Sequence, residues 1–342
     1  MADLDLGMAA ELREAPHVVA RQAPSLAAPI AELVRRLEQS PPGLVVTCAR
    51  GSSAHAATFG KHLFERHLGI AVVAAAPNIA TVYRRQLKLK DQLFLAVSQS
   101  GQSDDLLEMA AMAKASGAIT VALVNDTASP LACACDIVLP MGAGPELSVA
   151  ATKTFVATLA VLLRLAAAWT GREAMAAAID RLPERLAEAA ALDWSAALRV
   201  LSQTSSMVSI GRGPTLAIAR EASLKLKETC NLHAEAFSGA EFLHGPIALV
   251  SQLYPILLFM PTDEAAAGMR ELADDLTRKG ASLLIAEAGE IPGRLPALAP
   301  DHPDADAVCL IQSFYALVVA LAQSRGTNVD RPRHLQKVTR TR

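Results

Sequence analysis

Short, mainly apolar segments recur along this chain, each followed by a loop of small residues and a stretch with helical spacing. Residues 44–48, 92–97 and 118–124 are segments of this kind. A strand buried on both faces gives such an apolar run, and intervening helices supply the crossovers that parallel strands require. The pattern predicts an α/β fold with doubly wound parallel sheets flanked by helices.

The order of these elements repeats in the second half of the chain. Residues 44–68 and 207–229 each indicate a strand, a glycine-containing loop and a helix. Because 342 residues suffice for two ordinary domains, we expect an internal duplication. The expected ranges are an N-terminal helical segment at 1–25, a first domain at 26–170, a helical linker at 171–195 and a second domain at 196–342.

Other features bear on helices and on the cellular compartment. Residues 8–22 indicate a helix that breaks near Pro16, because proline removes a helical hydrogen bond. The apolar stretch at 155–169 contains Arg164 and is shorter than the ~20 residues of a membrane span, so it predicts a buried helix.

The five cysteines are scattered and lack metal-binding spacing, which indicates ordinary buried thiols. We expect a cytoplasmic protein.

The charge balance argues against nucleic acid or an anionic membrane as a partner. Lys plus Arg (32) nearly equals Asp plus Glu (34), so the chain has no strong overall field. The basic C-terminal stretch at 331–342 is short and has no aromatic residue, which is typical of a solvated end.

Two loops are candidates for holding a phosphate group. Gly51-Ser52-Ser53 and the run at 98–103 each follow an expected strand and precede an expected helix. Exposed N–H groups at a helix N-terminus favour an anion, and small hydroxyl side chains add donors. Neither loop has a nucleotide-binding pattern, so a single phosphate monoester is favoured. The alternative is that these serines and glycines only cap helices and form turns.

Six segments resemble the double sugar-isomerase (SIS) domain family. They are 98–103 (SQSGQS), 146–153 (ELSVAATK), 221–228 (EASLKLKE), 233–236 (HAEA), 244–246 (HGP) and 330–337 (DRPRHLQK). The likeness runs from about Glu11 to the C-terminus. It is shared by the isomerase half of glutamine–fructose-6-phosphate aminotransferase and by free-standing glucosamine-6-phosphate deaminases.

The resemblance implies a role for individual residues. It implies a homodimer in which His244, which opens the sugar ring, comes from the partner subunit. Glu228 would move the proton, Lys225 would lie near C1–C2, and Lys337, in a C-terminal tail that reaches the active site, could form an imine. No metal or cofactor is expected. Substrate phosphate would be bound by Ser53, Ser98, Gln99, Ser100 and Ser103, and the sugar pocket would include Val149 and Ala151.

The residue types themselves fit aldose–ketose chemistry. One carboxylate placed over two carbons can take a proton from C2 and return it at C1. Glu221, Lys225 and Glu228 fall on one face of a helix. One alternative for the Lys225–Glu228 pair is a solvated surface pair. One alternative for His244 is a satisfied core histidine. We expect His233 to have a structural role.

Departures from the aminotransferase favour release of ammonia. We expect no glutaminase domain before the isomerase segments, and Leu243 stands where the synthase has lysine. The expected reaction converts glucosamine 6-phosphate to fructose 6-phosphate and ammonia. Alternatives are a deaminase or deglycase of another amino-sugar or fructosamine phosphate, or a non-catalytic sugar-phosphate sensor. A sensor has no use for Glu228, His244 and Lys337 together, so an enzyme is favoured.

Overall fold

The computed structural model describes residues 7–289 and 293–337, which form two compact units. The N-terminal unit contains residues 17–146, 157–176 and 336–337. The C-terminal unit contains residues 7–16, 147–156, 177–289 and 293–335. The segment at 147–156 therefore belongs to the C-terminal unit, although it lies within the expected first domain.

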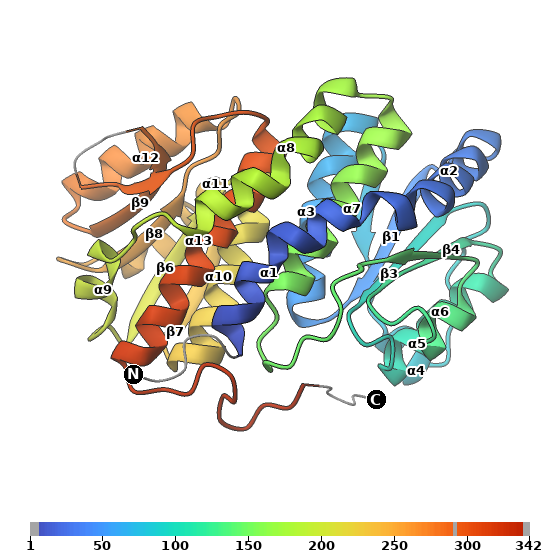
Figure 1. The fold of residues 1–342 in the computed structure, drawn as a ribbon, viewed down its shortest axis with the longest axis horizontal. Coiled ribbons are helices and arrows are strands. Elements are labelled where there is room, and N and C mark those ends of the chain that lie inside the picture. Colours follow the sequence, from blue (N-terminus) through green and yellow to red (C-terminus); the bar gives the residue numbers. More distant parts are fainter. Residues whose placement is uncertain (1–6, 290–292, 338–342) are drawn as a thin grey trace. The chain divides into compact units, whose positions relative to one another are not determined.

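The N-terminal unit is built on a sheet of five parallel strands in the order β2-β1-β3-β4-β5. Figure 1 shows this sheet with α4, α5 and α6 on one side and α2, α3 and α7 on the other. The strands are β1 (Leu44–Ala49), β2 (Ala71–Ala74), β3 (Leu93–Ser98), β4 (Ile119–Val124) and β5 (Ile137–Pro140). The helices are α2 (Ala23–Gln39), α3 (Gly51–Leu68), α4 (Asn78–Thr81), α5 (Asp104–Ala115), α6 (Pro130–Ala134) and the part of α7 (Lys153–Thr170) that follows residue 156.

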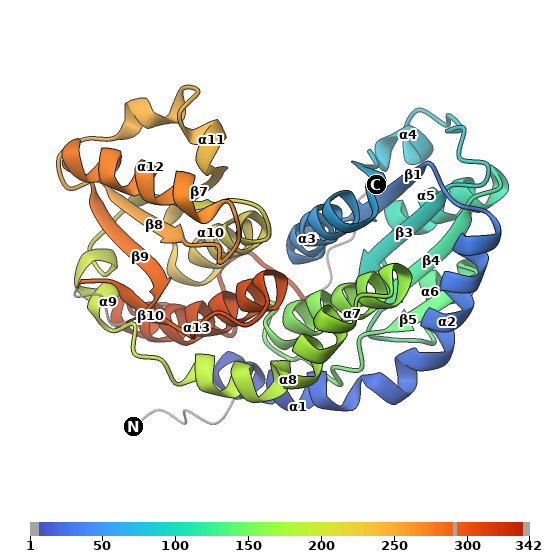
Figure 2. The same cartoon turned by 90° about the horizontal axis from the view of Figure 1, so that it is seen from above.

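The C-terminal unit repeats the arrangement with strand order β10-β9-β8-β6-β7, again all parallel. Its strands are β6 (Ser206–Gly211), β7 (His233–Ser238), β8 (Pro255–Phe259), β9 (Ser282–Ala288) and β10 (Leu295–Ala297). In Figure 2, α12 (Ala266–Arg278) and α13 (Pro303–Ser324) lie on opposite sides of this sheet. The remaining elements are α8 (Glu173–Ala190), α9 (Ala196–Leu201), α10 (Thr215–Cys230), α11 (Gly239–Phe242) and the 3-10 helix η1 (Pro246–Leu249).

The two sheets have the same topology. Numbered from the first strand of each unit, both follow the order 2-1-3-4-5. Parallel strands covered on both faces must be apolar throughout, and β3 and β8 are buried at every residue. The predicted α/β fold with two helix-flanked parallel sheets is confirmed.

The predicted break at Pro16 is wrong, because α1 (Met8–Arg21) continues through it. A proline inside a helix leaves the carbonyl four residues earlier without its N–H donor. Here that carbonyl is the one of Leu12, and the buried side chain of Gln312 donates to it at 2.7 Å. A partner from α13 thus replaces the missing backbone hydrogen bond.

Two helices, α7 and α13, are long and apolar enough to cross a membrane by composition alone. Within their most apolar windows, however, 78% and 89% of the residues are buried inside the protein. A helix that is apolar on all sides is typical of a buried core position. The prediction of a buried helix at 155–169 is confirmed, and α13 fills the same role in the C-terminal unit.

Candidate active site

The two predicted phosphate loops lie at the carboxyl ends of two neighbouring strands of the N-terminal sheet. Strands β1 and β3 are adjacent and parallel, with Ala49 opposite Val97, so the loops at 50–53 and 99–103 leave the sheet side by side. The strand order reverses here, because β2 lies beyond β1 while β4 lies beyond β3. In open parallel sheets, ligands bind in the crevice at such a switch point.

Both loops lead into helices whose first N–H groups have no side-chain cap. Helix α3 begins at Gly51 and α5 at Asp104, and neither N-cap side chain accepts a hydrogen bond from its helix. The hydroxyl of Ser103, the residue before α5, is therefore not used for capping. Uncapped N–H groups at the positive ends of two helices are suitable donors for an anion.

The loop at 98–103 is held in shape by its own serines. The Ser98 hydroxyl oxygen accepts from the Gly101 N–H at 3.1 Å, and that of Ser100 accepts from the Gln102 N–H at 3.3 Å. The Gln99 carbonyl accepts from the backbone of β4's following residue, Asn125. Since each hydroxyl oxygen accepts here, its hydrogen can still be donated to a phosphate oxygen.

Gly101 is required at its position for steric reasons. Its φ is +62°, and a side-chain carbon there would lie 2.1 Å from the Ser129 hydroxyl oxygen. A larger residue would therefore disturb the turn between Ser98 and Ser103.

An ion pair that the sequence did not indicate connects the two loops. The guanidinium of Arg50, just before α3, lies 2.7 and 2.9 Å from the buried carboxylate of Asp105 in the first turn of α5. The two residues are 55 positions apart, so no local spacing links them. The pair fixes one loop against the other.

Lys337 is paired with a buried carboxylate. Its Nζ lies 2.8 Å from Oε2 of Glu146, whose side chain is fully buried. Glu146 occurs in one of the resembling segments but was not assigned a role. The pairing places the Lys337 side-chain nitrogen next to a carboxylate.

The predicted catalytic face of α10 is a buried charged triad. Lys225 Nζ lies 2.6 Å from Glu228 and 3.2 Å from Glu221, and the Tyr315 hydroxyl donates to Glu221 at 3.4 Å. Burial alone would lower the pKa of Lys225, but the carboxylates of Glu221 and Glu228 outweigh it and raise that pKa. Lys225 is therefore an ammonium group at neutral pH.

The alternative of a solvated surface pair is wrong. The Lys225 side chain is 1% exposed, whereas that of Glu228 is 21% exposed. Glu228 lines a cavity of about 420 Å³ together with Arg331 and Arg333. A buried cation thus holds a carboxylate at the wall of a cavity, which is an arrangement suited to proton transfer.

The alternative of a core histidine is also wrong for His244, which is exposed. It follows α11, and its backbone N–H donates to the Glu241 carbonyl. Large apolar side chains nearby in the sequence are exposed as well: Leu243 (50%), Leu249 (48%) and Leu253 (70%). His233 is also exposed, at the first position of the edge strand β7.

The predicted sugar-pocket residues Val149 and Ala151 are half-buried in the C-terminal unit. The N–H of Val149 donates to the Asp330 carbonyl at 3.1 Å. Lys225, Glu228 and His244 belong to the same unit, whereas the five predicted phosphate-binding residues and Lys337 belong to the N-terminal unit.

No metal-binding cluster is evident among residues 7–289 and 293–337, and four of the five thiols are buried. They contain no group of three or more His, Cys, Asp or Glu side chains arranged to hold a metal ion. Burial raises the pKa of Cys48 and Cys309 to about 12 and that of Cys135 and Cys230 to about 11, so these thiols are unreactive at neutral pH. Cys133 is exposed, contrary to the expectation that all five are buried.

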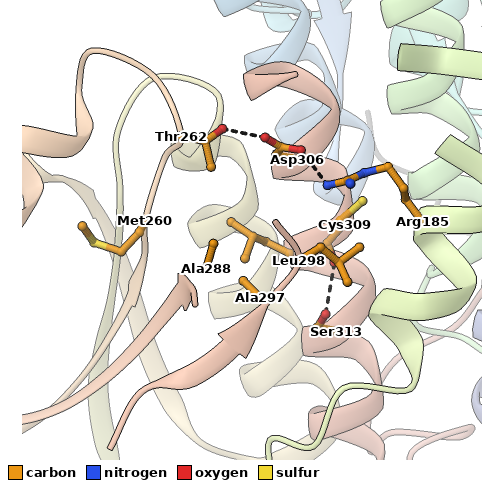
Figure 3. Close-up of a pocket in the computed structure, with 10 residues that line it drawn as sticks. Arg185, Met260, Thr262, Ala288, Ala297, Leu298, Asp306, Cys309 and Ser313 are labelled. Carbon is orange, nitrogen blue, oxygen red and sulfur yellow. Dashed lines mark hydrogen bonds and ion pairs between the residues drawn. The ribbon is translucent and has the colours of Figure 1, made fainter. Parts of the chain in front are cut away.

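A second cavity, shown in Figure 3, is too small for a sugar. Its volume is about 20 Å³, which is room for one water molecule. Asp306 on its wall accepts from Arg185 at 2.9 Å and from Thr262 at 2.7 Å. This network connects α8, α13 and the end of β8, and its role is structural.

Comparison with known proteins assigns the family. The sequence matches the SIS domain over residues 42–168 and 200–289, and the chain belongs to the SIS domain family. The predicted resemblance is thus confirmed, and the fold and family define a protein of the phosphosugar isomerase class.

Individual relatives agree with this assignment. A glutamine–fructose-6-phosphate aminotransferase of Symbiobacterium thermophilum is 33% identical over 86% of this chain and 51% of its own length. The chain therefore spans about half the length of the curated relatives it matches. A crystal structure from Silicibacter pomeroyi DSS-3, described as a candidate phosphosugar isomerase, is 41% identical with a TM-score of 0.90 over 94% of this chain and 99% of that one. A glucosamine-6-phosphate deaminase of Thermotoga maritima shares the fold, at 24% identity and TM-score 0.71 over 96% of this chain and all of that one.

Proposed function

We propose that this protein is a cytoplasmic enzyme that converts glucosamine 6-phosphate and water to fructose 6-phosphate and ammonia. The observation that carries the proposal is the triad on α10, in which buried Lys225 holds the Glu228 carboxylate at the wall of a cavity. A carboxylate fixed in this way, in a chain of the phosphosugar isomerase class, is a candidate base for proton transfer between C1 and C2.

The phosphate group would bind at the loops of the N-terminal sheet. Support comes from two uncapped helix N-termini and from the hydroxyls of Ser53, Ser98, Ser100 and Ser103, with Gln99 as a further donor. A phosphate dianion needs several donors at once, and hydrogen bonds to a charged group contribute about 1.5–3 kcal/mol each.

The chemistry would begin with ring opening and proceed by proton transfer. His244 would exchange the proton that opens the pyranose, since an imidazole has one nitrogen that can donate a proton and one that can accept it. Glu228 would then take the proton from C2 of the aldehyde form and return it at C1, giving an imine at C2. Water adds to that imine, the C–N bond breaks with its electron pair on nitrogen, and ammonia leaves with the ketone formed. The Lys225 ammonium would stabilise negative charge on the enediol-type intermediate.

Lys337 would act at the open-chain stage. An ammonium cannot attack a carbonyl, and Glu146 at 2.8 Å is placed to accept its proton. The free amine could then form an imine with the ketose carbonyl, releasing water. Trapping with borohydride in the presence of fructose 6-phosphate, followed by mass measurement of the Lys337 peptide, tests this step.

The proposed active form is a homodimer with His244 donated across the interface. The support is the exposure of His244 beside Leu243, Leu249 and Leu253, which are apolar side chains that a monomer exposes at a cost. Light scattering gives the mass in solution, and a monomer with full activity would contradict this proposal.

A substrate panel tests the function as a whole. The purified chain is incubated with glucosamine, galactosamine and fructosamine 6-phosphates, and both ammonia and ketose phosphate are followed. We expect fastest turnover of glucosamine 6-phosphate with equal amounts of both products. Preference for another member of the panel would reassign the substrate, and binding without turnover of any of them would indicate a sensor.

A further inference from the structure

The carboxylate of Glu11 is buried in the C-terminal unit and binds backbone rather than a cation. Only 5% of the residue is exposed, and its Oε1 accepts from the N–H groups of Leu147 and Ser148, the latter at 3.2 Å. Its Oε2 is buried without a hydrogen-bond partner in the described chain. A buried carboxylate without hydrogen-bond donors is destabilising, so the two N–H groups stabilise Glu11. In turn, Glu11 holds the backbone of residues 147–148 against helix α1.

The same helix also holds the other end of this segment. Glu14, three residues after Glu11 and so on the same face of α1, pairs with the buried Nζ of Lys153 at 2.6 Å. Two carboxylates of one helix therefore fix residues 147–148 and residue 153. Val149 and Ala151, the predicted sugar-pocket residues, lie in the sequence between these two attachments.

Asp330 closes the connection from the C-terminal tail. Its Oδ1 accepts from the Met8 N–H at the N-terminus of α1 at 2.7 Å and from the Ser148 hydroxyl at 3.1 Å, while its carbonyl accepts from Val149. A carboxylate at a helix N-terminus is stabilised by the helix dipole. Gly7 permits this approach, because a side-chain carbon there would lie about 2 Å from the Asp330 carboxylate.

Three segments far apart in the sequence thus each form hydrogen bonds with the other two. Helix α1 binds the segment at 147–149, that segment binds Asp330, and Asp330 caps α1. Resting on the function proposed above, we propose that Glu11 and Asp330 are positioning residues. They hold the backbone at 147–151 in the shape that receives the sugar, without touching the substrate themselves.

The test compares Glu11→Ala with Glu11→Gln in the full chain. Glutamine keeps an oxygen that can accept from both N–H groups, whereas alanine removes it. In Glu11→Ala we expect amide hydrogen exchange at 147–151 to accelerate and KM for glucosamine 6-phosphate to rise about tenfold, the equivalent of one lost buried hydrogen bond. Inhibition by inorganic phosphate, which would bind at the loops of the N-terminal unit, should be unchanged, and Glu11→Gln should restore most of both properties.

Gln312→Leu is the matched control, because it also loosens α1 but acts through Leu12 and leaves the segment at 147–151 untouched. At equal loss of melting temperature it should not reproduce the rise in KM. If Glu11→Ala does not fold, Ser148→Ala removes the hydroxyl that donates to the Asp330 carboxylate and should give the same changes in weaker form.

The outcomes separate this role from the proposed function. Unchanged amide hydrogen exchange at 147–151 in Glu11→Ala would show that Glu11 does not hold this segment, and this result does not depend on which reaction the enzyme catalyses. Faster exchange with unchanged KM, or an equal rise in KM in Gln312→Leu, would show that Glu11 is only structural. A wild-type chain that neither binds nor turns over any sugar phosphate would overturn the proposed function and the sugar-positioning role with it. The amide hydrogen exchange result would still show whether Glu11 holds the segment at 147–151.

Discussion

Glu221 and Lys225 are one turn apart in α10, and their charged groups are 3.2 Å apart with side chains 0% and 1% exposed. Because both side chains are buried, water cannot replace either charged group as the partner of the other. Removing Glu221 leaves the buried Lys225 ammonium with one carboxylate fewer, and breaking a buried ion pair typically costs about 3–5 kcal/mol. Glu221 therefore keeps Lys225 charged, and Lys225 in turn holds Glu228.

We predict that Glu221→Gln lowers stability strongly at neutral pH. In the wild type the folded-state pKa of Lys225 is raised, so this contribution to stability is present below about 10.5 and is lost as pH rises through the raised value. In the variant, burial acts with one carboxylate fewer and the Lys225 pKa falls. The stability gap to the wild type should then narrow as pH rises, because the variant's Lys225 sheds its proton.

Thermal unfolding between pH 7 and pH 10 measures this gap. Tyr315→Phe is the matched control, since it removes the hydroxyl that donates to Glu221 at 3.4 Å and keeps both charges. A Glu221→Gln protein as stable as the wild type at pH 7 would show that the buried pair does not hold the triad together.

We predict that Asp105→Asn weakens binding of phosphorylated substrates without removing any phosphate contact. The variant loses the ion pair with Arg50 that fixes the two loops, and KM should rise about threefold to tenfold for the loss of one partly buried charged bond. The control is Glu108→Gln on the same helix, because its pair with Arg84 is largely exposed and should contribute less than about 1 kcal/mol. Equal KM values for the two variants would contradict a role for Asp105 in loop placement.

We predict that Ser100→Ala reduces sugar-phosphate affinity roughly tenfold to a hundredfold, since a hydrogen bond to a charged group contributes about 1.5–3 kcal/mol. Unphosphorylated glucosamine should be a very poor substrate. Calorimetric titration with fructose 6-phosphate measures the first effect, and initial rates measure the second. Equal turnover of phosphorylated and unphosphorylated sugar would exclude the loops as the anchor.

The strands and the positions of the two serine-containing loops could be predicted because both depend on local sequence, whereas phosphate binding by these loops stays a prediction. An apolar run marks a buried strand, and a glycine–serine loop marks the following helix N-terminus. The helix α13 was not predicted, because a helix buried on all sides has no amphipathic period. The edge strand β7 was missed because its burial pattern does not give an apolar run.

The residues missed around the candidate site have partners that are distant in the sequence. Arg50 and Asp105 are 55 positions apart, Glu11 and Leu147 are 136 apart, and Glu146 and Lys337 are 191 apart. No periodicity relates such positions, so only the fold reveals the pairs. The α10 triad was predictable because its members follow helical spacing, although the sequence could not show that Lys225 is buried.

We predict that inactive subunits can restore each other's activity. If His244 and Glu228 serve one site from different chains, mixing Glu228→Gln with His244→Ala under conditions of subunit exchange gives hybrid sites with both groups intact. Activity should return in part. No recovery, with exchange demonstrated by labelled subunits, would mean that His244 acts within its own chain or not at all.

If Glu228 carries the proton between C1 and C2, Glu228→Gln should remove most of the activity. Glutamine keeps the shape and a hydrogen bond to Lys225 but cannot act as a base. We predict a rate constant reduced about 10²–10⁴-fold, with substrate affinity and melting temperature changed much less. A folded Glu228→Gln protein that turns over its best substrate at near wild-type rate would show that Glu228 is not the base.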